Sequence, residues 1–292
     1  MSKASEKFRK EAKASDDIRD AGLTTPDDIV RYDDIVYGDD PKWQVLDVYR
    51  PKAADGKKLP VIVSVHGGGW VYGDKERYQY YCMNLAQRGF AVVNFTYRLA
   101  PEHKFPAPLE DTNSVFTWVK ANARQYGFDA KHIFGVGDSA GAHILGLYSG
   151  ICTNRKYAAN YDFAPPRGFA PTAIGLNCGA FVISLTGDGD VPELMTDLLP
   201  GGGKPEDLAL LQVADVVTGR YPPVFVMTAT EDFLKDQPPF LIEKLMAHDV
   251  PFTVRYYGDK KKRLPHVFHC NVRSDDAKLC NDEQCDFFKK FL

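Results

Sequence analysis

The sequence predicts an α/β fold in which a mostly parallel sheet of eight strands carries helices on both faces. From residue 25 onward, short apolar runs rich in Val, Ile, Phe and Tyr alternate with longer amphipathic stretches, a pattern typical of βαβ units. The chain has 292 residues, of which 44% are hydrophobic and 26% are charged. These values fit a single globular domain and exclude disordered, collagen-like and coiled-coil chains.

Eight runs have the length and composition of strands, because β-branched and aromatic residues dominate them. They cover residues 29–37, 44–49, 60–65, 90–96, 132–136, 172–177, 223–228 and 252–257. Five stretches repeat apolar residues at three- and four-residue steps, as one face of a helix does. They cover residues 76–88, 109–126, 140–153, 234–248 and 277–291. Right-handed crossovers between parallel strands would place these helices on both faces of the sheet.

Two segments interrupt the alternation and are candidates for a cap. Residues 1–30 are polar and helix-prone, and residues 154–220 contain long connections with Gly, Pro and aromatic residues. Long ordered loops in a compact domain commonly serve as lids or caps; surface excursions without such a role are the alternative. Aromatic residues between Tyr157 and Phe169 are expected to help enclose an apolar pocket.

Composition excludes several classes of partner. Lys and Arg total 36 against 39 for Asp and Glu, a formal charge of −3, so the basic footprint of a nucleic-acid-binding protein is missing.

The first 20 residues lack the apolar core of a signal peptide, and no run of 18 apolar residues follows. This predicts a cytoplasmic protein without membrane insertion. The six cysteines form no CxxC pair and are expected to be free thiols that bind no metal.

The strongest local pattern is GDSAG at residues 137–141, which ends a strand-like run and opens a helix-like one. A sharp strand-to-helix turn strains the backbone of the serine, and side chains at the two glycine positions would collide with their neighbours. Ser139 would then lie at a helix N-terminus, where the dipole and free N–H groups favour developing negative charge. The pattern predicts a nucleophilic serine.

A second pattern, HGGGW at residues 66–70, follows the third strand-like run. Consecutive glycines let backbone N–H groups approach a ligand, as acyl transfer requires for the oxyanion of its intermediate. We predict oxyanion donors at Gly67 and Gly68, completed by the N–H of Ala140, and we expect His66 to orient the loop. A flexible turn between a strand and a helix is the alternative interpretation.

Both motifs resemble those of the hormone-sensitive-lipase-like esterases, a family of α/β-hydrolases. YRLAPEH at residues 97–103, followed by FPA, is similar to another segment of that family, and LDVYRP at residues 46–51 resembles an early strand of related carboxylesterases. The resemblance spans residues 44–268. It implies the α/β-hydrolase fold, a Ser–Asp–His triad and no requirement for a metal ion or an organic cofactor. The chain departs from the family at Ala142-His143, where many members carry another glycine.

The resemblance also places the other two members of the triad, which follow the serine in the order acid, then histidine. EDFLKD, after the run 223–228, resembles the family's DPLRD and makes Asp232 the acid, with Glu231 and Asp236 as competitors. LPHVF, in the loop after the last strand-like run, is similar to the family's HxF and makes His266 the base.

Five further residues near these motifs have an expected role. Trp70 and Tyr72, beside the oxyanion loop, are expected to line the substrate pocket. Asp138 is expected to anchor the turn around the serine and to influence the pocket through its charge. Arg98 and Glu102 are interpreted as a structural ion pair rather than as ligand anchors.

The predicted function is that of a serine carboxylesterase, which hydrolyses short-to-medium acyl esters through an acyl-enzyme intermediate. A small-molecule ester is the expected partner, and the sequence leaves open whether the chain forms a homodimer. Two alternatives also stay open. An arylformamidase-like amidase would use the same residues, and a non-catalytic small-molecule receptor would resemble the plant relatives that have lost a triad residue.

Overall fold

One sheet of eight strands runs through the protein in the order β1-β2-β4-β3-β5-β6-β7-β8. The computed structural model of the chain describes residues 1–186 and 190–292, so residues 187–189 of the expected second cap segment lie outside the described residues. Every predicted strand is present. The strands are β1 (Ile29–Val36), β2 (Val45–Pro51), β3 (Leu59–Val65), β4 (Ala91–Phe95), β5 (Phe128–Asp138), β6 (Ile174–Asn177), β7 (Val224–Ala229) and β8 (Phe252–Tyr257).

The sheet is antiparallel at one edge and parallel elsewhere, which confirms the predicted fold class. β2 pairs antiparallel with β1 and β4, whereas the pairs from β4 to β8 are parallel. Parallel strands end at the same edge of a sheet, so the loops that follow β3, β5, β7 and β8 meet there. Ligands of open α/β sheets bind in the crevice at this edge.

The helices include the five that the sequence predicts and several more. They are α1 (Lys3–Asp20), α2 (Lys75–Ala86), α3 (Ala107–Ala121), α4 (Ala123–Tyr126), α5 (Ala140–Thr153), α6 (Arg155–Ala158), α7 (Val191–Leu198), α8 (Pro205–Ala209), α9 (Val213–Val216), α10 (Pro238–Ala247) and α11 (Asp275–Lys289), with short 3-10 helices η1 (Lys52–Ala54) and η2 (Phe268–Cys270). The predicted stretch 109–126 is divided at Asn122 into α3 and α4. α10 begins at Pro238 because residues 234–237 form turns after Asp232.

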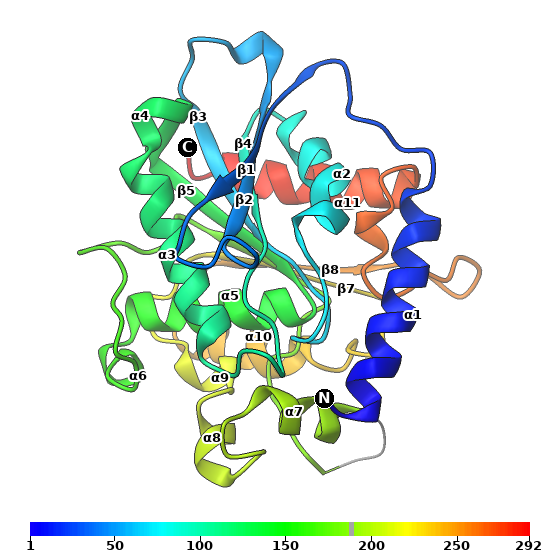
Figure 1. Ribbon diagram of the computed structural model, residues 1–292, viewed down its shortest axis with the longest axis vertical. Coiled ribbons are helices and arrows are strands. Elements are labelled where there is room, and N and C mark those ends of the chain that lie inside the picture. Colours follow the sequence, from blue (N-terminus) through cyan, green and yellow to red (C-terminus); the bar gives the residue numbers. More distant parts are fainter. Residues whose placement is uncertain (187–189) are drawn as a thin grey trace.

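Alternating side chains divide the core between the two faces of the sheet. In β3, Val61, Val63 and Val65 belong to one hydrophobic cluster, whereas Ile62 belongs to the other. Residues of α3, α5 and α10 complete the first cluster, and residues of α2 and α11 complete the second (Figure 1). This period of two is that of a sheet buried on both sides, and it confirms helices on both faces.

The N-terminal helix α1 lies along one side of the molecule, with its first turn beside α7 (Figure 1). The N–H of Ser2 and the hydroxyl of Ser5 both donate to the carboxylate of Asp197 on α7, at 2.8 and 2.6 Å. These bonds fix the start of α1 to α7. Among the described residues, no helix has both the length and the apolar character needed to cross a bilayer.

An ion pair on α1 corrects one expectation. Glu102 pairs with Arg9 of α1 at 2.6 Å. Arg98 instead pairs with Glu110 at 2.7 Å and Asp111 at 2.9 Å, both on α3. The predicted Arg98–Glu102 pair is therefore wrong, because α3 supplies the partners of Arg98 and α1 supplies the partner of Glu102.

Lys75 is a buried cation in the first turn of α2. Its ammonium group lies 3.0 Å from Asp47 and 2.8 Å from Asp34, and the buried Asp47 also accepts a hydrogen bond from Tyr49 at 2.8 Å. Burial alone would lower the pKa of Lys75, but these carboxylates raise it above its ordinary value. The Lys75 ammonium group therefore stays charged and ties α2 to β2.

Removing the Lys75 ammonium group should destabilise the fold. Lys75→Met leaves the Asp47 carboxylate buried without a cation, and breaking a buried pair in this way costs about 3–5 kcal/mol. We expect the free energy of unfolding, measured by urea denaturation, to fall by that amount. Lys13→Met breaks the exposed Lys13–Asp17 pair and should leave the free energy of unfolding nearly unchanged. Equal losses in the two variants would show that the buried Lys75–Asp47 pair contributes no more to the free energy of unfolding than the exposed Lys13–Asp17 pair does.

Candidate active site

The turn between β5 and α5 holds Ser139 in a strained backbone conformation. Its φ of 51° and ψ of −118° lie outside the regions that L-residues favour. A Cβ on Gly137 would approach the carbonyl of Gly141 to 2.6 Å, and a Cβ on Gly141 would overlap the carbonyl oxygen of Val65. The expected collisions are confirmed, so packing requires both glycines.

The Asp232 carboxylate and the His266 imidazole form a hydrogen-bonded pair, with Oδ1 and Nδ1 2.6 Å apart. Asp232 also accepts hydrogen bonds from Thr228 Oγ1 at 2.7 Å and from the N–H of Leu234 at 2.8 Å. Burial alone would raise the pKa of Asp232, but these partners bring it below its ordinary value. The carboxylate therefore stays ionised and holds the His266 proton on Nδ1, which leaves Nε2 free to accept a proton.

The structure brings His266 and Ser139 into the lining of one cavity of about 360 Å³. The two competitors of Asp232 lie elsewhere: Glu231 pairs with Arg263, and Asp236 is exposed. Of the three acidic candidates, only Asp232 contacts the histidine. Its position thus favours it as the acid of a triad.

The loop after β3 is held by Tyr78, a residue of α2 that sequence reasoning missed. The N–H of Gly67 donates to Tyr78 Oη at 2.9 Å, and this hydroxyl donates to Asp138 Oδ2 at 2.7 Å. The expectation that Gly67 supplies an oxyanion donor is wrong, because its N–H is already bonded inside the protein. No local sequence signal marks Tyr78, since its role depends on how α2 packs against the sheet.

Three neighbouring amide groups are available instead. Gly68, Gly69 and Ala140 line the cavity, and within the described residues their N–H groups donate no hydrogen bond. His66 Nδ1 donates to the carbonyl of Gly67 at 2.7 Å, which is the orienting bond expected of it. Unpaired N–H groups beside a nucleophile are suited to a developing oxyanion, so we assign the candidate donors to Gly68, Gly69 and Ala140.

The expected pocket residues Trp70, Tyr72 and Asp138 all line the cavity. The aromatic residues expected from the segment after α5 do not. Tyr157 and Phe169 belong to the core cluster beneath α3 and α5, where Phe169 packs against a phenylalanine of α3. That expectation is wrong because these side chains pack against the helices that cover the sheet and do not line the cavity.

Further walls come from the two segments that interrupt the strand–helix alternation. α1 contributes Phe8, Asp16 and Arg19. The chain after β6 contributes mostly apolar side chains, namely Ala180, Val182, Ile183, Val191, Pro192 and Leu194, with the hydroxyl groups of Ser184 and Thr186. In the sequence of α1, Phe8 and Ile18 are the two large apolar residues. An isolated large apolar residue in a polar helix is the signal that could have marked Phe8 as a packing position.

His143, in the first turn of α5, fixes Trp70, which lines the cavity. Trp70 Nε1 donates to His143 Nδ1 at 3.2 Å, and His143 Nε2 donates to the carbonyl of Leu211 at 2.9 Å. Burial lowers the pKa of His143 to about 4, so the ring stays neutral. His143 therefore positions Trp70 and has no free nitrogen for proton transfer.

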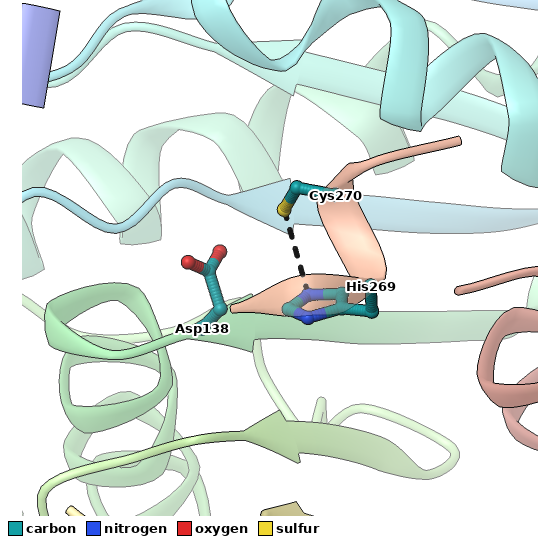
Figure 2. A group of neighbouring side chains, drawn as sticks. All are labelled: Asp138, His269 and Cys270. Carbon is teal, nitrogen blue, oxygen red and sulfur yellow. Dashed lines mark hydrogen bonds between the residues drawn. The ribbon is translucent and has the colours of Figure 1, made fainter. Parts of the chain in front are cut away.

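Asp138, His269 and Cys270 form a buried cluster at the end of β5 (Figure 2). Their potential ligand atoms lie within 4.8 Å of one another, and His269 Nε2 is 3.7 Å from Cys270 Sγ. Carboxylate, imidazole and thiolate are ligands that Zn²⁺ accepts. Burial, however, raises the pKa of Cys270 well above its ordinary value, so its thiol stays protonated. Tyr78 also occupies one oxygen of Asp138, and these states favour packing over metal ligation.

Comparisons with known proteins identify similar sequences and a similar fold. A family model described as BD-FAE matches residues 46–174. Esterase LipC of Mycobacterium tuberculosis is 30% identical over 210 residues, which cover 71% of this chain and 49% of LipC. Carboxylesterase NlhH of the same organism is 31% identical over 208 residues, which cover 66% of this chain and 62% of NlhH. The crystal structure of an inhibited esterase B from Lactobacillus rhamnosis has a TM-score of 0.90 at 26% identity, covering 98% of this chain and 95% of that one.

The strand order and the strained serine turn define the chain as an α/β-hydrolase. Its matched relatives and its structural neighbour are named as esterases, and the chain is similar to them in sequence and in fold. It spans about half the length of LipC and 62% of the length of NlhH.

The buried charge of Asp138 should make the stability of the fold depend on pH. Burial raises the pKa of Asp138 from 3.8 to about 6, so the stability that this carboxyl contributes at low pH is lost as the pH rises through 6. Relative to the wild type, Asp138→Asn should therefore gain about 2.4 kcal/mol in free energy of unfolding between pH 4 and pH 8. Urea denaturation of both proteins at both pH values measures this gain.

The matched control is Asp27→Asn, which replaces an exposed aspartate. It corrects for any general effect of removing one carboxylate from the chain. A gain in Asp138→Asn no larger than the gain in Asp27→Asn would mean that burial does not destabilise the ionised form of Asp138.

Proposed function

We propose that the chain is a serine carboxylesterase that hydrolyses short-to-medium acyl esters. The observation that carries the proposal is the shared cavity, which is lined by the strained Ser139, by His266 with its Asp232 partner, and by unpaired backbone amides. Esterase names among the matched relatives support the same reaction class. The apolar walls and the cavity volume of about 360 Å³ suit a small acyl ester.

The proposed reaction has two halves, the formation of an acyl-enzyme and its hydrolysis, and both use the same groups. His266 Nε2 removes the proton of Ser139 Oγ as that oxygen attacks the ester carbonyl, and the Gly68, Gly69 and Ala140 amides donate to the resulting oxyanion. His266 then gives the proton to the departing alcohol oxygen, and an acyl-enzyme forms. A water molecule, deprotonated by His266, attacks the acyl-enzyme in the same way and releases the acid and Ser139.

Asp232 supports both steps without exchanging a proton. Its ionised carboxylate bonds His266 Nδ1 at 2.6 Å, which fixes the tautomer and stabilises the imidazolium that forms transiently. Thr228 and the N–H of Leu234 keep that carboxylate in place. The acid is therefore buried and oriented before a substrate arrives.

The two alternatives receive less support. The same residues could cleave an aryl formamide, but the matched relatives are named as esterases. A non-catalytic receptor would be expected to lack a member of the triad, whereas Ser139 and His266 both line the cavity here and Asp232 bonds His266, which supports the enzyme. An ester is thus the substrate that the site favours.

We extend the proposal to the organisation of the chain. α1 and the segment around α7 form the cap of a single hydrolase domain, since both line the cavity and bond to each other. The location in the cell is the cytoplasm, a proposal supported by six cysteines that are all free thiols, as is normal in a reducing compartment.

Replacing the nucleophile should abolish hydrolysis. We expect Ser139→Ala to lower kcat/KM for p-nitrophenyl butyrate by at least about 10³-fold, measured by p-nitrophenol release. Ser114→Ala, on α3 and outside the cavity, is the matched control and should hydrolyse the ester as the wild type does. Retained activity in Ser139→Ala would sink the proposed nucleophile, and faster turnover of an aryl formamide than of the ester would favour the amidase.

A further inference from the structure

The cavity has two unlike ends, separated along α1. The ring of Phe8 lies against Gly69 of the oxyanion loop, and the first turn of α1 is bonded to α7. This end is mostly apolar, with walls from the chain after β6, which also brings Ser184 and Thr186 into the lining. Asp16 lies eight residues farther along the helix, about 12 Å at 1.5 Å per residue, and bonds Tyr72. The second end therefore begins where α1 approaches α2.

The second end is lined by polar groups. Asp16 Oδ2 accepts a hydrogen bond from Tyr72 Oη at 3.0 Å, and Asp16 Oδ1 lies 2.8 Å from Arg19. Tyr78 and Asp138 also line the cavity at this end and bond each other at 2.7 Å. Burial raises the pKa of Tyr72 above its ordinary value, so its phenol remains a neutral hydroxyl that both donates and accepts.

Arg19 does not make this end an anion site. Its guanidinium forms two hydrogen bonds with Asp20, at 2.8 and 2.7 Å, and also contacts Asp16 and the carbonyl of Arg77. Asp138 adds another carboxylate. The acidic groups outnumber this one paired cation, so an anionic ligand would be repelled, whereas a hydroxyl group would find both acceptors and donors.

The contrast between the ends limits which ester fits the whole cavity. An alkyl group placed among Asp16, Tyr72 and Asp138 would remove their polar atoms from water without replacing the lost hydrogen bonds. Sites built to bond a hydroxyl group reject analogues that lack it far more strongly than apolar pockets reject a change of one methylene. An acyl chain, in contrast, suits the apolar end beside Phe8 and Leu194.

We propose that the preferred substrate is a short-chain acyl ester of a polyhydroxylated alcohol, such as a partial ester of glycerol. The acyl chain lies at the apolar end, and the free hydroxyls of the alcohol bond Asp16 and Tyr72 at the polar end. This inference rests on the proposed esterase function and adds the class of alcohol. Asp16 and Tyr72 are its specificity-determining residues.

The test compares two esters that share one acyl group. Glyceryl monobutyrate carries two free hydroxyls, and butyl butyrate, used below its solubility limit, carries none. We expect the wild type to have a kcat/KM at least about tenfold higher for monobutyrin. Tyr72→Phe and Asp16→Asn should each lower that ratio about tenfold, because the first removes a hydroxyl group and the second replaces one acceptor oxygen with an NH2 donor.

Asp17→Asn is the matched control, since Asp17 lies next to Asp16 on α1, is exposed and does not line the cavity. It should leave the ratio unchanged. A wild-type ratio near one, or a ratio that Tyr72→Phe and Asp16→Asn leave unaltered, overturns the polar subsite while p-nitrophenyl butyrate hydrolysis still supports the esterase. Absence of Ser139-dependent hydrolysis of all three esters overturns the esterase proposal itself.

Discussion

The contact of Gly141 with the carbonyl oxygens of Val65 and His66 is the constraint on which the site depends. It presses the first turn of α5 against the end of β3, which is feasible because β3 and β5 are neighbours, with Val65 paired to Gly137. The chain makes this turn by placing Ser139 at positive φ, a strain of about 1–3 kcal/mol. The same contact brings the helix N-terminus and the loop after β3 to one cavity, so nucleophile and amides are positioned together.

Tyr78 extends this constraint to the loop. Gly67 is anchored through its N–H by Tyr78 and through its carbonyl by His66, and the unpaired amides of Gly68 and Gly69 follow directly. Amides that are fixed before substrate arrives need no reorganisation when charge develops. The other end of the Tyr78 bridge is a carboxylate, Asp138, whose burial opposes its ionisation. The site thus combines rigidity with a local loss of stability, as functional sites commonly do.

Local features of the sequence were enough to predict the strands and the serine turn, because the steric demand of Gly137 acts within five residues, on Gly141 and Ala142. Family resemblance, not spacing, led to Asp232 and His266, which the structure joins. The errors all involve contacts between separate elements of the fold. The N–H of Gly67 meets a side chain of α2, Glu102 meets α1, and α1 rather than residues 157–169 closes the cavity. Such contacts depend on how helices pack, which no local pattern encodes.

The most direct test is the crystal structure of the protein after reaction with p-nitrophenyl butylphosphonate, which transfers its phosphorus to a nucleophilic serine. We expect phosphorus bonded to Ser139 Oγ and a phosphonyl oxygen about 3 Å from the N–H groups of Gly68, Gly69 and Ala140, with Gly67 still bonded to Tyr78. A phosphonyl oxygen bound by Gly67 after loss of the Tyr78 bond, or phosphorus on another side chain, would contradict the arrangement described for this site.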